Sequence, residues 1–278
     1  MIEWKKAPGG TLRPARGENM ENILECIGLT KDYKGLRALD NLTFSVPDAG
    51  KVVGLLGTNG SGKTTLIKLI AGLLTPTAGS VFVAGLPIGT QTKEIVAYLP
   101  DTHFLNASFS VKDEVAYYKD FFADFDEGRA WKMIDDLGVG RTQKVRTLSK
   151  GNKEKLGLIL TLARNARLYI FDEPIAGVDP AARDYILRTI LNNRAPGSTM
   201  IICTHLIGDI EPVLDYVLFL QAGKIVLQGG ANAIRKGEGK TIDQLFREVV
   251  RWERTETNIG LKRTGRTGSA GGKSAGKD

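Results

Sequence analysis

The chain has 278 residues, 42% of them hydrophobic and 25% charged, which suits one large domain with an ordinary buried core. Two cysteines cannot form a disulfide framework, so we expect Cys26 and Cys203 to be buried free thiols. No apolar stretch reaches the roughly 18 to 20 residues that span a bilayer, which excludes an integral membrane helix within this sequence.

The net charge of +7 lies mostly near the two ends, because residues 1–20 carry +2 and residues 262–278 carry +4. The basic composition therefore does not predict a nucleic-acid groove. We expect a disordered extension over residues 1–20, which lack periodicity, and a disordered basic tail over residues 259–278, which are rich in Gly, Ser and Lys. The sequence leaves open whether translation starts at Met1 or at Met20.

In chain order, strands and helices alternate. Hydrophobic patterns predict strands at 23–29, 42–46, 51–56, 80–84, 168–171 and 200–203, and helices at 63–72, 111–122, 130–137, 153–162 and 181–192. A hairpin at 216–220 and 224–227 follows, and then an amphipathic helix from Thr241. The run at 51–56 is apolar throughout, as in a parallel strand buried on both faces. This order predicts an α/β fold with an embedded helical subdomain.

Residues 57–64 read Gly-Thr-Asn-Gly-Ser-Gly-Lys-Thr, between a buried strand and an apolar helix. Glycines let such a loop curl so that several backbone N–H groups point at one phosphate, and the helix dipole adds positive charge. Lys63 would contact the β- and γ-phosphates, and the Thr64 hydroxyl would ligate Mg²⁺. The predicted nucleotide site comprises Gly57, Thr58, Asn59, Gly60, Ser61, Gly62, Lys63, Thr64 and Thr65.

Two carboxylates, Asp172 and Glu173, follow the apolar strand at 168–171. Ligands of α/β proteins bind at the carboxyl ends of strands, so Asp172 is a candidate Mg²⁺ ligand and Glu173 a candidate general base. His205 ends the next strand in the same way, and beside a phosphate site we interpret it as the group that contacts the γ-phosphate.

These motifs in this order resemble the nucleotide-binding domain of ABC ATPases over about residues 22–230. Residues 148–152, Leu-Ser-Lys-Gly-Asn, resemble the signature motif of that family, usually Leu-Ser-Gly-Gly-Gln. The resemblance implies a P-loop NTPase fold of the ABC type, with an N-terminal antiparallel β element, that uses ATP and Mg²⁺. It also implies an ATPase domain over 21–230, a helical subdomain at about 100–165 and a C-terminal helical extension at 231–258.

The resemblance also assigns roles outside the phosphate loop. Tyr33 lies where the family stacks an aromatic ring on adenine, and Asp179 lies in a segment that resembles the D-loop. In the family the signature contacts the nucleotide of the opposite subunit, which here assigns Ser149, Lys150, Gly151 and Asn152 to a second chain's ATP. Two chains would then enclose two ATP molecules head to tail.

Two departures from the family pattern affect the site. Asp101 replaces the usual Q-loop glutamine; it can still reach Mg²⁺ or its waters, but it adds a negative charge. Lys150 and Asn152 replace a glycine and the glutamine of the signature. This variant set resembles a bacterial exporter branch that includes acetoin-utilisation-type and antibiotic-resistance ATPase subunits.

The resemblance implies hydrolysis that drives a separate membrane-spanning permease, from the cytoplasmic face of the cell membrane, with membrane contact only through that partner and no specific nucleic acid. The alternatives are a soluble ABC ATPase that acts on ribosomes or DNA, a regulatory ABC subunit of a heterodimer, and a P-loop kinase. A single P-loop and the absence of long coiled coils disfavour the first, and the signature segment disfavours the kinase. The transported substrate, and whether the dimer is homo- or heteromeric, are not encoded in any motif.

Overall fold

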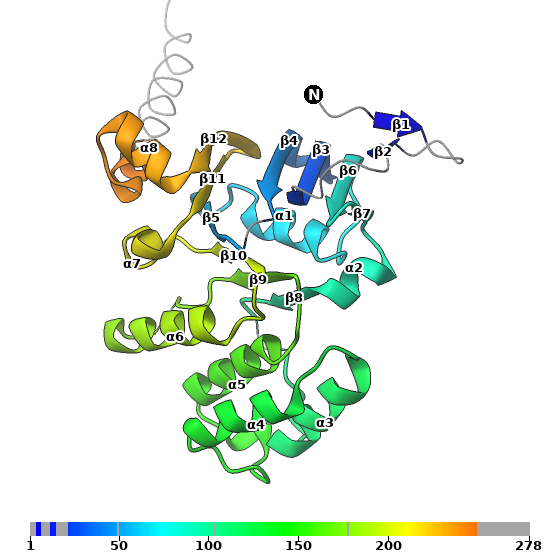
Figure 1. Ribbon diagram of the computed structural model, residues 1–278, viewed down its shortest axis with the longest axis vertical. Helices are drawn as coiled ribbons and strands as arrows, with labels where there is room; N and C mark the ends of the chain where they lie inside the picture. Colours follow the sequence, from blue (N-terminus) through cyan, green and yellow to red (C-terminus); the bar gives the residue numbers. More distant parts are fainter. Residues whose placement is uncertain are drawn as a thin grey trace, which may run out of the picture.

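The computed structural model describes residues 4–6, 12–14, 22–48, 50–102, 104–176 and 178–248. A six-stranded sheet in the order β12-β11-β5-β10-β9-β8 crosses the centre of the protein (Figure 1). Its strands are β5 (Val52–Leu56), β8 (Val96–Leu99), β9 (Leu168–Asp172), β10 (Thr199–Cys203), β11 (Tyr216–Gln221) and β12 (Lys224–Gly230). The first five run parallel, and β12 pairs antiparallel with β11. Every residue of β5, β9 and β10 is buried, as their continuous apolar sequences predict.

A second, antiparallel sheet has the order β4-β3-β6-β7. It consists of β3 (Asn22–Tyr33), β4 (Leu36–Pro47), β6 (Ala78–Val83) and β7 (Leu86–Pro87). Helix α1 (Lys63–Ile70) lies between the two sheets, and its apolar side chains join a core with residues from both. This arrangement confirms the predicted α/β fold and its N-terminal antiparallel element.

Three helices form a separate lobe below the sheets in Figure 1: α3 (Val111–Phe121), α4 (Glu127–Asp136) and α5 (Lys150–Leu162). A short 3-10 turn, η1 (Val145–Thr147), precedes α5. Each helix begins at a side chain that accepts a hydrogen bond from the first turn, namely Ser110, Asp126 and Ser149. The helices predicted at 111–122, 130–137 and 153–162 correspond to these three.

Further elements surround the sheet. Helix α6 (Pro180–Asn193) lies between β9 and β10, α7 (Ile207–Ile210) and the 3-10 turn η2 (Glu211–Val213) follow β10, and α8 (Ala231–Glu238) follows β12. Residues 242–248 are helical, which agrees with the helix predicted from Thr241. None of the helices in the described part of the chain has the length and apolar character that crossing a bilayer requires.

The structure adds elements that the sequence patterns did not predict: α2 (Thr90–Ile95), β8, α7 and a pair of short antiparallel strands, β1 (Trp4–Lys6) and β2 (Leu12–Pro14). This strand pair falls within the predicted disordered extension at 1–20, whose other residues lie outside the described ones. The predicted tail at 259–278, and the extension beyond 248, also lie outside them. Cys26 and Cys203 are buried free thiols, as predicted.

One buried arginine joins the helical lobe to the sheets. Arg164, just before β9, is 3% exposed. Its guanidinium donates to both carboxylate oxygens of Asp124, between α3 and α4, at 2.7 and 3.0 Å. It also donates to the Val96 and Glu94 carbonyls, at the start of β8 and the end of α2, at 3.0 and 2.8 Å. The ion pair thus fixes the point where the chain returns from the lobe to the sheet.

We predict that Arg164→Met destabilises the protein by roughly 3 kcal/mol, because it leaves a partly buried carboxylate and several carbonyls without their donor. Urea denaturation followed by circular dichroism would measure this change. Arg141→Met is the control, since Arg141 pairs with Asp135 at 2.7 Å but is about half exposed. An equal loss in the free energy of unfolding for the two variants would contradict a special role for the buried Arg164–Asp124 pair.

Candidate functional site

Four segments that the sequence predicts to be functional meet at one edge of the central sheet. Strand β5 leads into the phosphate loop, β8 into Asp101, β9 into Asp172 and Glu173, and β10 into His205. These strands are parallel, and Cys203 pairs in register with both Leu55 and Asp172. Their carboxyl ends therefore open on the same side, where α/β proteins bind ligands.

The phosphate loop is shaped by glycines at its two ends. A Cβ added to Gly57 would lie 2.3 Å from the Leu220 carbonyl oxygen, so only glycine fits against β11. Gly62, the residue before α1, has φ 106°, and a Cβ there would lie 2.6 Å from the Ala38 carbonyl oxygen. The loop therefore packs tightly on its surroundings and leads directly into the first turn of α1, whose amides have no partner within the helix.

Lys63, the first residue of α1, is 7% exposed and folds back over this loop. Its ammonium group donates to the Gly57 and Thr58 carbonyls at 2.8 and 3.0 Å. The Ser61 hydroxyl oxygen is buried and has no hydrogen-bond partner among the described residues. A cation held over a curled loop, beside an unpaired hydroxyl and free helix amides, is an arrangement that fits phosphate oxygens.

Asp172 is 1% exposed, and neither carboxylate oxygen has a hydrogen-bond partner in the described part of the chain. Burial raises the pKa of this carboxyl above its usual range, while the Cys203 thiol and the Thr64 hydroxyl nearby oppose that shift. Two unpaired buried oxygens next to a hydroxyl fit a small hard cation. No group of three or more His, Cys, Asp or Glu forms a metal site among the described residues.

Glu173 and His205 form a direct contact beside this carboxylate. The imidazole Nδ1 lies 3.0 Å from both Glu173 carboxylate oxygens, and the Glu173 amide donates to the Cys203 carbonyl at 2.8 Å. Glu173 has φ 52°, an unfavourable conformation for a residue that precedes proline. Backbone strain at a strand end is typical of side chains held in position for chemistry.

A cleft of about 560 Å³ opens between these strand ends and the helical lobe. Asp101, Asp172, Glu173 and His205 line it from the sheet, and Lys150 and Lys153 line it from α5. Phe104 and Leu105 add an apolar wall. Phe104 can pack on α5 because Gly157 has no side chain: a Cβ there would lie 3.1 Å from the phenyl ring.

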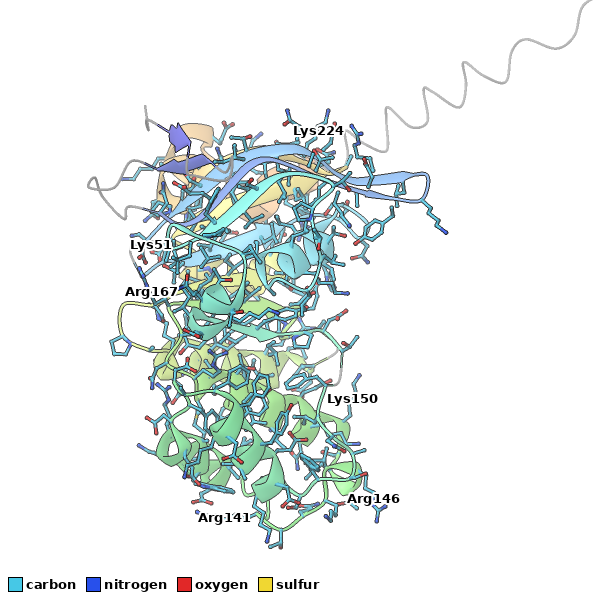
Figure 2. The ribbon with its side chains drawn as sticks, turned by 90° about the vertical axis from the view of Figure 1, so that its right-hand side faces the viewer. Lys51, Arg141, Arg146, Lys150, Arg167 and Lys224 are labelled. Atoms are coloured by element: carbon cyan, nitrogen blue, oxygen red, sulfur yellow. The ribbon has the colours of Figure 1, made fainter. Side chains whose placement is uncertain are left out.

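The remaining predicted residues lie at the surface. Ser149 and Gly151 are exposed at the N-terminus of α5, and the Ser149 hydroxyl accepts from the Asn152 amide at 3.2 Å. The Lys150 side chain is 73% exposed (Figure 2 shows it on the flank of the molecule). Tyr33 is 41% exposed at the end of β3, and Asp179 is exposed before α6. The aromatic and D-loop roles of these two residues stay predictions.

The sequence patterns do not identify three contributors to this site, Phe104, Gly157 and Cys203. Phe104 and Gly157 together shape the cleft, but each is unremarkable in its own segment, because the contact joins a loop and a helix far apart in the chain. Cys203 was noted only as a buried thiol, and its place beside Asp172 follows from the register of β9 and β10.

We predict that Asp172→Asn stabilises the protein near neutral pH in the absence of nucleotide and divalent cations. The free energy of unfolding should rise by about 1 kcal/mol, and the melting temperature by roughly 2–4 °C. A folded-state pKa above the usual value of 3.8 makes the ionised form destabilising, an effect present above the raised pKa and lost as pH falls toward 3.8. The gain should therefore shrink in acid. Scanning calorimetry at several pH values, with the exposed Asp120→Asn as control, would reveal it. A lower melting temperature at neutral pH would contradict this prediction, because it would show that other groups in the folded protein stabilise the ionised Asp172 carboxylate.

Comparison with known proteins places these features in one family. The family model described as ABC transporter matches residues 39–176. The uncharacterized ABC transporter ATP-binding protein YhcH of Bacillus subtilis is 32% identical over 219 residues, covering 74% of this chain and 70% of that protein. The Nod factor export ATP-binding protein I of Rhizobium meliloti is 29% identical, covering 84% and 72%. The lantibiotic transport ATP-binding protein SrtF of Streptococcus pyogenes is 26% identical, covering 84% and 99%.

The comparison with solved structures leads to the same family. The ATP-binding subunit of an ABC transporter superposes with a TM-score of 0.74 at 28% identity, covering 82% of this chain and 99% of that one. A nucleotide-free ATP-binding cassette of an ABC transporter has the same fold, with a TM-score of 0.65 at 24% identity, covering 79% and 96%. The family resemblance noted in the sequence is thus confirmed, and this chain belongs to the ABC transporter ATP-binding proteins.

Proposed function

We propose that this chain hydrolyses ATP and thereby drives a separate membrane-spanning subunit of a bacterial exporter. One observation carries the proposal: the phosphate loop, the unpaired Asp172 carboxylate and the Glu173–His205 pair converge at one edge of the sheet. Similarity to a protein named for Nod factor export supports the export direction.

The proposed division of labour follows from the geometry of each group. The phosphate-loop amides and Lys63 bind the β- and γ-phosphates, and Tyr33 stacks on the adenine. Thr64, Asp172 and Asp101 hold Mg²⁺, which supplies stabilisation of the negative charge that develops on the phosphates. Asp172 suits that role because its two oxygens are buried and unpaired, so a cation would satisfy them.

Glu173 is the proposed general base. Its side chain is 18% exposed, at the wall of the cleft, and His205 holds both carboxylate oxygens at 3.0 Å. A base fixed in this way can orient a water molecule and take up its proton. His205 itself is 47% exposed and lines the same cleft, where it can also contact the γ-phosphate.

The site of one chain is completed by a second copy or a homologous chain in this proposal. Ser149, Lys150 and Gly151 form an exposed helix start, and the amides of such a start attract anions. In a head-to-tail dimer these residues would contact the nucleotide that the partner's phosphate loop holds. Lys150 adds a positive charge that the usual glycine of the signature lacks.

The membrane subunit would contact the cleft beside the helical lobe. Phe104 and Leu105 offer apolar surface there, and Lys150 and Lys153 offer positive charge. A short amphipathic helix from a cytoplasmic loop of the permease matches such a groove. Because the cleft adjoins Asp101 and Glu173, the permease helix bound there would respond to the nucleotide state. Through this partner, the protein would act at the inner face of the membrane.

The decisive experiment is Mg²⁺-dependent ATP hydrolysis by the purified chain at several protein concentrations. We predict a specific activity that rises with concentration, because two chains form each site, and a loss of at least about 100-fold in kcat for Glu173→Gln, which cannot accept a proton.

Glu127→Gln serves as the matched control, since Glu127 lies on α4 and pairs only with Lys119 at 2.7 Å and Trp131 at 3.2 Å among the described residues. It should retain full activity. Absence of hydrolysis at every concentration would rule out a self-sufficient homodimer, and unchanged specific activity on dilution would rule out a site shared between weakly associated chains.

A further inference from the structure

Arg183 links two loops that approach the candidate site from different strands. It lies in the first turn of α6, and its Nε donates to the Val178 carbonyl at 3.0 Å. Its Nη1 donates to the Asp209 carboxylate on α7 at 2.9 Å. Val178 belongs to the loop after β9, and α7 follows β10. One guanidinium therefore joins the two segments that come directly after these strands in the sequence.

These two segments are the ones that hold the Glu173–His205 pair. Glu173 begins the loop that runs to Val178, and His205 comes just before α7 and Asp209. The imidazole contacts the Glu173 carboxylate at 3.0 Å. The contacts therefore close into a ring: from Glu173 along the loop to Arg183, across to Asp209, back along α7 to His205, and to Glu173 again.

Helix stability does not explain an arginine at this position. A positive charge in the first turn of a helix opposes the helix dipole. The Arg183 and Asp209 side chains are 25% and 39% exposed, and ion pairs of that exposure contribute little to folding. The planar guanidinium is, however, suited to donate to a carbonyl and a carboxylate at once, which a lysine ammonium cannot reproduce with the same fixed geometry.

We infer that Arg183 is a positioning residue that couples the loop carrying Val178 and Asp179 to the His205 segment. This inference rests on the proposed function, in which Glu173 and His205 serve hydrolysis. A displacement of either segment is therefore passed through the Arg183–Asp209 ion pair to the other, and so to the Glu173–His205 contact.

A double-mutant cycle with Arg183→Met and Asp209→Asn tests the coupling. Each single variant should lower kcat for ATP about tenfold, and should change KM less than about twofold because neither side chain touches the nucleotide of its own chain. The double variant should be no slower than the slower single one, since both substitutions break the same link. Multiplicative losses, or wild-type kcat in Arg183→Met, would overturn the inference.

Arg167→Met is the matched control. Arg167 (labelled in Figure 2) pairs with Asp48 at 2.6 Å, with side chains 40% and 17% exposed. It precedes β9 and so lies at the opposite end of that strand from Glu173. It should keep the wild-type kcat, so a loss there equal to that of Arg183→Met would show a general stability effect.

Amide hydrogen exchange of the nucleotide-free protein separates this inference from the proposed function. Arg183→Met should speed exchange both in the peptide that carries Val178 and in the peptide that carries His205 and Asp209, while Arg167→Met should speed neither. If the wild type fails to hydrolyse ATP, the proposed function fails, yet this readout still decides whether the link exists. Faster exchange in only one of the two peptides would contradict the coupling.

Discussion

The parallel alignment of β5, β8, β9 and β10 is the constraint on which the site depends. Parallel strands end at the same edge, so the phosphate loop, Asp101, the Asp172–Glu173 pair and His205 are brought together although long stretches of chain separate them. The apolar sequences of β5, β9 and β10, buried on both faces, supply the stability that holds the alignment. Polar residues at the strand ends are then positioned by the backbone of the sheet.

The aligned strands hold a site whose residues lower the stability of the folded chain. The Asp172 carboxylate is buried without a hydrogen-bond partner among the described residues, and burying such a group costs free energy. Glu173 adopts φ 52° before Pro174, a conformation that costs on the order of 1–3 kcal/mol. Both features oppose folding and both lie where a cation and a phosphate would bind. This distribution indicates that binding, rather than stability, accounts for these residues.

The sequence predicted what is local and periodic. The phosphate loop was recognisable because its glycines, lysine and threonine lie within eight consecutive positions, and buried strands such as β9 were recognisable from continuous apolar runs. Short elements such as α2 and α7 were missed because four to six residues carry too little periodicity. Contacts between distant residues, such as Arg164 with Asp124 or Arg183 with Asp209, could not be predicted, since no local pattern records which side chains the fold brings together.

Two arginines, Arg164 and Arg183, join separate parts of the molecule in different ways. Arg164 ties the helical lobe firmly to β8 and α2, but only where the chain returns from α5 to β9. The opposite side of the lobe, with Lys150 and the cleft, has no comparable buried ion pair among the described residues. The cleft therefore lies where the lobe is held to the sheet less firmly. The cleft and the Arg183 contacts thus adjoin the same two residues, Glu173 and His205, from two sides.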